Sequence, residues 1–186
     1  FTLKPFKSGA TVKVGRYTVK SIPVAHPVES CGYVISDGRS TMAISGDTGP
    51  TDRFWERMAA HDVKYLITET SFPNRLEKLA LTTGHLTPSL LEKEIAKMSR
   101  PPEKIFIMHL KPQFLNEIEM EIRGLERENI EFLKDGEVIL ARGLEVDAAS
   151  RLFIRADIAD RLDRAIELNK AAEAAAAEFF DQSTEA

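Results

Sequence analysis

The sequence predicts an α/β fold in which a mixed sheet is flanked by helices, followed by an Ala-rich C-terminal helix. Short β-branched runs separated by glycine turns fill the first 45 residues, and helical and strand-like segments alternate from residue 51 onwards. Hydrophobic residues make up 43% of the chain, which is enough for a buried core. Alternation of strands and helices is typical of a sheet with helices packed on it.

The first part of the chain contains strands joined by tight turns. We expect strands at residues 11–14, 17–24, 32–35 and 41–45. Gly15 and Arg16 join the first two strands, in the position of a hairpin turn. Asp37 and Gly38 lie between the next two strands, and Asp-Gly is a common turn sequence. These four strands predict an antiparallel start to the sheet.

The second part alternates between helices and strands and ends in a tail of different composition. We expect helices at residues 51–60, 75–81, 88–98 and 114–128, and strands at residues 63–68, 104–108, 130–133 and 138–141. The first domain then covers residues 1–143, and residues 144–186 form an acidic helical tail. In the tail, Ile158, Leu162 and Ile166 make an apolar stripe, which predicts an amphipathic helix at about residues 156–180. Such a stripe fits a helix packed on its own domain. It fits equally a helix that pairs two subunits in a homodimer, or a linker helix.

Charge and cysteine content restrict the partners. The chain has 25 basic and 29 acidic residues, and 10 of the acidic and 5 of the basic ones lie in residues 145–186. Residues 1–144 therefore hold 19 acidic and 20 basic side chains, without the basic excess typical of nucleic-acid binding. One cysteine, Cys31, allows no disulfide within the chain, and no apolar run approaches the length of about 18 residues needed to span a membrane. We expect no membrane partner, no nucleic-acid partner and a cytoplasmic location.

Three residues of types that commonly bind metals follow predicted strands. His26, Asp47 and His109 come directly after the strands at 17–24, 41–45 and 104–108. Ligands of α/β proteins gather at the carboxyl ends of strands, and imidazole with carboxylate suits Zn²⁺. Each residue alone is a weak signal, because a single histidine after a strand is more often a hydrogen-bonded structural residue.

The sequence around these residues resembles the metallo-β-lactamase superfamily of hydrolases. The similarity covers about residues 12–142. It includes His26 followed by a Gly-Tyr strand, Asp47 in Ser-Gly-Asp-Thr, Glu69 in Glu-Thr-Ser-Phe-Pro-Asn, His85 in Gly-His-Leu-Thr-Pro and His109 in His-Leu-Lys-Pro. The last three blocks resemble class II 3′,5′-cyclic-nucleotide phosphodiesterases most, and ribonuclease Z, the tRNA 3′-processing enzyme, is the nearest alternative.

The resemblance implies a site and a reaction. His26 would bind the first metal, Asp47 would bridge both metals and His109 would bind the second. The cofactors would be two divalent ions, Zn²⁺ first and Mn²⁺ or Fe next. Dinuclear-metal hydroxide attack would convert cAMP or cGMP to the 5′-monophosphate, and His85 would help to protonate the leaving oxygen. Glu69 would either orient a ligand or have a structural role.

The chain departs from the family in one respect. The family's His-x-His-x-Asp-His cluster, which supplies most of the metal ligands, is absent. The resemblance therefore implies the C-terminal half of an αββα sandwich, which would need a missing N-terminal half as its partner, bind metal weakly alone and be inactive alone. The alternatives are a degenerate homologue and, from another class, a non-catalytic scaffold that dimerises through the tail helix.

Several further residues could contribute to substrate binding, and Lys111 and three aromatic residues also have a purely structural interpretation. Thr87 is placed to cap a helix starting at Pro88, and the free N–H groups of that helix would favour an anion beside His85. Lys111 would neutralise phosphate or be an ordinary surface lysine. The aromatic side chains would stack on a purine or belong to the core: Phe54, Trp55 and Phe72.

Overall fold

The structure is a computed structural model that describes residues 7–133. Several expectations lie outside the described residues, namely the strand at 138–141, the helix at about 156–180 with its apolar stripe, and the whole tail at 144–186. Among the described residues, no helix has the length and apolar character required to cross a membrane.

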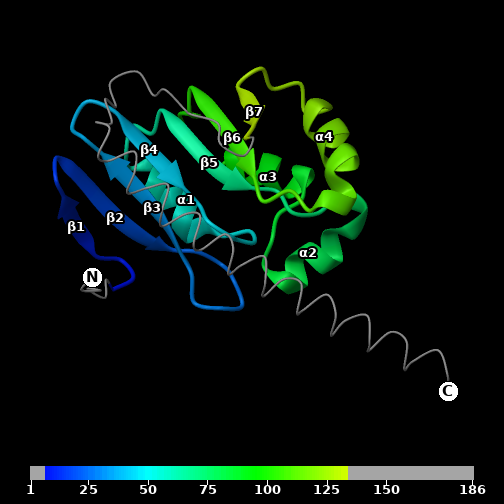
Figure 1. The fold of residues 1–186 in the computed structure, drawn as a ribbon, viewed down its shortest axis with the longest axis horizontal. Coiled ribbons are helices and arrows are strands. Elements are labelled where there is room, and N and C mark those ends of the chain that lie inside the picture. The colour runs from blue at the N-terminus through cyan, green and yellow to red at the C-terminus, as the bar shows by residue number, and fades with distance from the viewer. Residues whose placement is uncertain (1–6, 134–186) are drawn as a thin grey trace. The chain divides into compact units, whose positions relative to one another are not determined.

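A mixed seven-stranded sheet organises the described part of the chain (Figure 1). Its strands follow one another across the sheet in sequence order: β1 (Thr11–Val14), β2 (Tyr17–Pro23), β3 (Cys31–Ser36), β4 (Thr41–Ile44), β5 (Tyr65–Glu69), β6 (Lys104–Met108) and β7 (Ile130–Phe132). Neighbours from β1 to β4 are antiparallel, and neighbours from β4 to β7 are parallel. The predicted α/β class with a mixed sheet is confirmed.

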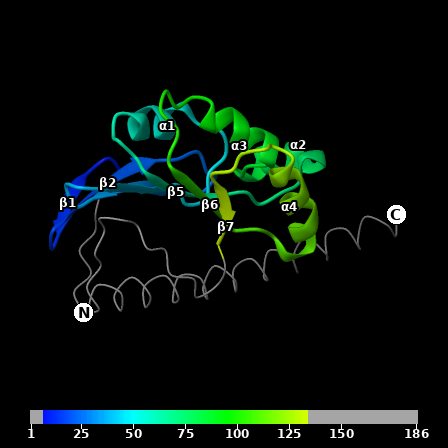
Figure 2. The same ribbon diagram turned by 90° about the horizontal axis from the view of Figure 1, so that it is seen from above.

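Helices enclose the main core on one side of the sheet. They are α1 (Asp52–Ala59), α2 (Glu77–Thr83), α3 (Pro88–Ile95) and α4 (Leu115–Arg123), with short 3-10 turns at η1 (Asn74–Leu76) and η2 (Pro112–Phe114). Figure 2 shows α1 and α3 lying over one face of the sheet. Phe54, Trp55 and Met58 of α1 are completely buried, so Phe54 and Trp55 belong to the core and not to a base-stacking surface.

The two faces of the sheet carry different apolar clusters. Side chains alternate between the faces along each strand. Leu66, Ile105 and Ile107 point into the helix-covered core. Tyr65 and Phe106 form a second cluster, with Met42, Ile67 and Leu133 packed against it. None of the described helices contributes to this second cluster.

Strand direction explains why functional side chains gather at one edge. Since β2 and β4 are both antiparallel to β3, they run in the same direction, and β5 and β6 are parallel to β4. These four strands therefore have their carboxyl ends at the same edge. The residues that follow or end these strands are His26, Asp47, Glu69 and His109.

Several predicted elements differ by a few residues from the observed ones, and two of these differences have a clear local cause. The helix expected at 114–128 ends at Arg123, because Gly124 caps it and Glu126 takes a positive φ of 53°. The strand expected at 63–68 begins at Tyr65, because Val63 instead closes a turn by donating its N–H to the carbonyl of His61. Neither difference moves the strand ends that carry the site.

Candidate metal centre

The loop that carries Asp47 is tied to the strands on both sides of it. Thr48 is completely buried, and its N–H donates to Glu69 Oε1 at 2.9 Å. Its hydroxyl accepts from the N–H of Ala25 at 3.3 Å, and the N–H of Gly49 donates to the carbonyl of Ala25 at 2.6 Å. These bonds connect the loop to the segment after β2 and to the end of β5, and so fix the position of Asp47 between them.

Glu69 is the centre of a buried hydrogen-bond network. Its side chain is completely buried. Its Oε1 is 2.7 Å from His85 Nδ1 and accepts from Thr48 N–H. Its Oε2 accepts from the Ser71 hydroxyl at 2.6 Å and from the N–H of Leu86 at 3.4 Å. With these four hydrogen-bond partners, the Glu69 carboxylate connects the loops that carry Thr48, Ser71 and His85.

His85 is brought to the site by Gly84, a glycine at which any side chain would be strained. Gly84 ends α2 with a φ of 72°, a left-handed conformation that favours glycine. A Cβ on Gly84 would lie 2.5 Å from Pro27 Cδ and 3.0 Å from His26 Cα. The close approach sets the His85 and His26 rings edge to face with their centroids 5.4 Å apart.

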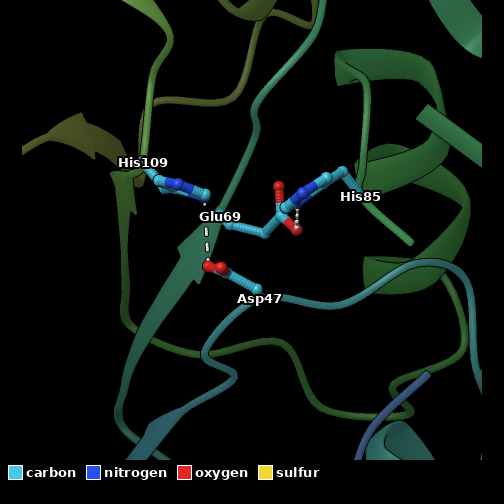
Figure 3. Close-up of side chains that lie close together, drawn as sticks. All are labelled: Asp47, Glu69, His85 and His109. Atoms are coloured by element: carbon cyan, nitrogen blue, oxygen red, sulfur yellow. Dashed lines mark hydrogen bonds and ion pairs between the residues drawn. The ribbon is translucent and has the colours of Figure 1, made fainter. Parts of the chain in front are cut away.

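His109 lies directly against Asp47 (Figure 3). Its Nδ1 is 3.0 Å from Asp47 Oδ1 and 3.1 Å from the hydroxyl oxygen of Ser71. The backbone at His109 has a φ of 59°, which is uncommon for a residue other than glycine and is frequent at functional sites. The His109 ring centroid is 5.4 Å from that of His85.

The surroundings of Asp47 and His109 shift both pKa values in the directions that favour an ion pair. Burial alone would lower the pKa of His109, but the hydrogen bond to Asp47 and its negative charge outweigh burial, so this pKa is raised. Burial would raise the pKa of Asp47, but the hydrogen bond from His109 and the nearby imidazoles lower it. Both shifts favour the charged forms.

His26 takes a place beside this group and not within it. Asp47, Glu69, His85 and His109 each offer a ligand atom, and these atoms lie within 4.8 Å of one another. His26 is not among them, although its ring touches that of His85. The Nδ1 of His26 lies 3.4 Å from the N–H of Val28, so Nε2 is the nitrogen left for a ligand.

The donor atoms that remain available suit a divalent metal. Both oxygens of Glu69 already accept hydrogen bonds, so this carboxylate is a poor ligand and a good positioning group. Asp47 has 40% of its side chain exposed, and among residues 7–133 its carboxylate pairs only with His109, which leaves carboxylate oxygen for a cation. Imidazole and carboxylate ligands of this kind are those that Zn²⁺ prefers. The residues present therefore fit a metal, with Asp47 and His109 among the grouped donor atoms and His26 beside them.

Sequence reasoning was wrong about the start of α3. Thr87 does cap the helix, accepting from the N–H of Leu90 at 3.3 Å, as predicted. However, the N–H of Ser89 donates to Asn74 Oδ1 at 2.8 Å. The N–H groups expected to attract an anion are thus already bonded, and His85 must act without them.

Sequence reasoning also missed the role of Ser71 and left that of Glu69 open. Glu69 was recognisable as a carboxylate at a strand end, but its four hydrogen-bond donors come from other loops. Ser71 lies in the Glu-Thr-Ser-Phe-Pro-Asn block, but nothing in the sequence indicated a role for its hydroxyl. Phe72 is buried with its ring 5.8 Å from that of His85, so it supports the site from the core.

Comparison with solved structures identifies the fold. The chain is similar to the metallo-β-lactamase fold protein YhfI from Bacillus subtilis, with a TM-score of 0.60 and 17% identity over 71% of this chain and 53% of that one. It is similar to the short form of human tRNase Z, with a TM-score of 0.54 and 16% identity over 69% of this chain and 45% of that one. It is also similar to Zn²⁺-bound PqqB from Methylobacterium extorquens, with a TM-score of 0.52 and 17% identity over 73% of this chain and 51% of that one.

These likenesses confirm the metallo-β-lactamase fold that the sequence motifs predicted. The chain spans about half the length of the solved structures that it matches. No protein-family model and no curated protein sequence matches it. The roles of the individual site residues and the cyclic-nucleotide subclass stay predictions.

Proposed function

We propose that this chain is the C-terminal half of a metal-dependent hydrolase that acts on phosphodiesters. One observation carries the proposal: Asp47 and His109, which are 62 positions apart in the sequence, lie 3.0 Å from each other, and His85 lies beside them. The metallo-β-lactamase fold of the chain supports it.

Three side chains would hold the metal. Asp47 and His109 would supply an oxygen and an Nε2, and His26 would supply the Nε2 that faces away from its Val28 contact. Bound divalent ions, Zn²⁺ first, would lower the pKa of water and polarise the phosphate oxygens. In the metal-free chain His109 holds Asp47, so metal binding would break this pair and displace any proton from His109 Nε2.

His85 would serve as the proton donor to the leaving oxygen. A carboxylate can only accept, so Nδ1 of His85 must donate to Glu69 Oε1 at 2.7 Å. Nε2 is then the one ring nitrogen that can deliver a proton to the substrate. The buried Glu69 fixes the ring orientation, so the donor remains aimed at the site.

Lys111 supports an anionic substrate. Its ammonium group lies 5.1 Å from the centre of the Phe72 ring, a cation–π contact that places it beside the site. Burial and the positive charge of Lys111 both act to lower the pKa of His109, although Asp47 and Glu69 raise it overall. Among the described residues no carboxylate forms an ion pair with Lys111, so its charge is available to a phosphate group.

The proposed substrates are 3′,5′-cyclic nucleotides, cAMP or cGMP. The blocks around Glu69, His85 and His109 resemble class II phosphodiesterases, and the near balance of charge in residues 1–144 argues against a long nucleic acid. The test is hydrolysis of cAMP, cGMP and a tRNA precursor by the Zn²⁺- or Mn²⁺-loaded protein, including any residues encoded before Phe1, with Asp47→Ala as the inactive control. Hydrolysis of neither cyclic nucleotide would refute this substrate class.

A tRNA 3′-processing nuclease is the second candidate. The fold likeness to human tRNase Z favours it. In the same assay this candidate predicts cleavage of the tRNA precursor and little turnover of cAMP or cGMP.

We also propose that a second half-domain is the partner of this chain. The apolar cluster of Tyr65 and Phe106 lies on the sheet face that none of the described helices covers, and the chain spans about half of its structural neighbours. An N-terminal half would cover this face and bring further metal ligands. A metal-free scaffold that dimerises through the tail is the competing proposal, and bound metal found by elemental analysis of the native protein would exclude it.

A further inference from the structure

The Ser71 hydroxyl contacts His85, His109 and the buried carboxylate of Glu69. The Ser71 side chain is completely buried, and its N–H donates to the carbonyl of Leu86 at 3.1 Å. From this fixed backbone the hydroxyl oxygen lies 2.6 Å from Glu69 Oε2, 3.1 Å from His109 Nδ1 and 3.3 Å from His85 Nδ1.

The direction of these hydrogen bonds follows from the chemistry of the groups. A hydroxyl has one proton and two lone pairs, whereas a carboxylate can only accept. Ser71 therefore donates its proton to Glu69 Oε2, the shortest of its contacts. The hydroxyl oxygen can then only accept further hydrogen bonds, so its contact with His109 requires a proton on Nδ1 of that ring.

Asp47 competes with Ser71 for the same proton. Asp47 Oδ1 is 3.0 Å from His109 Nδ1, and the Ser71 oxygen is 3.1 Å from it. If Asp47 turned to a bound metal, Ser71 would be the partner left for His109 Nδ1. His109 would then keep its Nδ1 proton and present an unprotonated Nε2, which is the form that a metal needs.

We propose that Ser71 is a positioning residue that holds His109 in the Nδ1–H tautomer and thereby prepares its Nε2 to bind metal. The metal part of this inference rests on the proposed function, but the tautomer part does not. Because Ser71 and His85 bond to the two oxygens of one carboxylate, the same network orders the proposed proton donor and the proposed metal ligand.

The tautomer is tested without metal in a background that lacks Asp47. Long-range ¹H–¹⁵N spectra of the full chain at alkaline pH report the protonated nitrogen of each ring, and four histidines make the assignment tractable. In Asp47→Ala we expect His109 to remain in the Nδ1–H form, because Ser71 still accepts. Adding Ser71→Ala should produce a mixture of both tautomers.

Two further variants serve as controls. Ser71→Thr in the Asp47→Ala background keeps the hydroxyl and should restore the Nδ1–H form. Ser21→Ala in the same background removes another buried hydroxyl, one that bonds to the carbonyls of Lys7 and Ala10, and should change nothing. Equal His109 spectra with and without the Ser71 hydroxyl would overturn the inference.

Zn²⁺ titration of the full chain separates this inference from the proposed function. With Asp47 intact, Ser71→Ala should weaken Zn²⁺ binding about tenfold or more, as loss of such an outer hydrogen bond usually does, and Ser71→Thr should bind like the wild type. Unchanged Zn²⁺ affinity in Ser71→Ala would overturn the metal part. A wild-type chain that binds no Zn²⁺ would instead contradict the proposed function, while the tautomer spectra would still decide the role of Ser71.

Discussion

Replacing Glu69 by alanine should destabilise the protein more than any other single change at the site. Three donors lie within 2.9 Å of its carboxylate oxygens, namely Thr48 N–H, the Ser71 hydroxyl and His85 Nδ1. A buried donor left without a partner costs about 1–3 kcal/mol. Three of them at the low end predict a loss of about 3 kcal/mol in the free energy of unfolding, a large part of the stability of an ordinary domain.

Glu69→Gln should cost far less, about 1 kcal/mol, because the amide oxygen can still accept from Thr48 and His85 while its NH₂ group donates to Ser71. Urea unfolding followed by tryptophan fluorescence measures both changes, since the single tryptophan, Trp55, is completely buried.

The matched control is a glutamate outside the network. Glu103 has 65% of its side chain exposed and lies 4.0 Å from Lys64, so Glu103→Ala should change stability by less than about 0.5 kcal/mol. If Glu69→Ala unfolds at the same urea concentration as the wild type, the network does not hold the loops together, and the explanation of how the site is built is wrong.

Three further changes have defined outcomes. Asp47→Asn removes the ion pair with His109 and should cost about 1 kcal/mol or less. The raised pKa of His109 contributes stability below its ordinary value of 6.5 and loses it as pH rises through the folded pKa. The lowered pKa of Asp47 contributes above 3.8 and loses it as pH falls through the folded pKa. The free energy of unfolding lost in Asp47→Asn, measured by urea unfolding, should therefore be largest at pH values between these two pKa values. An equal loss at alkaline pH would contradict the Asp47–His109 ion pair. Lys111→Ala should raise the inhibition constant of inorganic phosphate or vanadate about tenfold, or about 1.4 kcal/mol, with Lys111→Arg retaining most of the binding; equal inhibition of Lys111→Ala and wild type would remove the lysine from the site. Gly84→Ala places a Cβ at a positive φ and 2.5 Å from Pro27 Cδ, so it should lower the free energy of unfolding by about 2 kcal/mol. It should also shift the ring signals of His26 in NMR spectra. Unchanged His26 signals would show that the position is not strained.

The sequence was sufficient for those parts of the site that depend on strand direction. His26, Asp47 and His109 each follow a strand, and the observed sheet brings the ends of these strands to one edge. Such a prediction needs only local patterns and the rule that ligands gather at the carboxyl ends of strands. The same patterns predicted the turn at Asp37, whose carboxylate accepts from the N–H groups of Arg39 and Ser40.

The parts that depend on contacts between distant loops could not be predicted. Asn74 satisfies the N–H of Ser89, 15 residues away, so the free helix start expected beside His85 does not exist. The hydrogen bonds of Glu69 come from residues 48, 71, 85 and 86, and no sequence spacing indicates such a meeting. The homodimer and the cytoplasmic location stay predictions.

Calorimetric titration of the full chain with Zn²⁺ tests the proposed metal centre most directly, by comparing the wild type with variants of Asp47, His109 and His61. His61 serves as the control histidine, because its Nε2 contacts Lys20 at 3.5 Å and it does not belong to the cluster of possible ligands. We predict saturable binding by the wild type and by His61→Ala, and binding at least about tenfold weaker in Asp47→Ala and His109→Ala. Equal affinity in all four proteins, or no binding by the wild type, would contradict the claim that these residues form a metal centre.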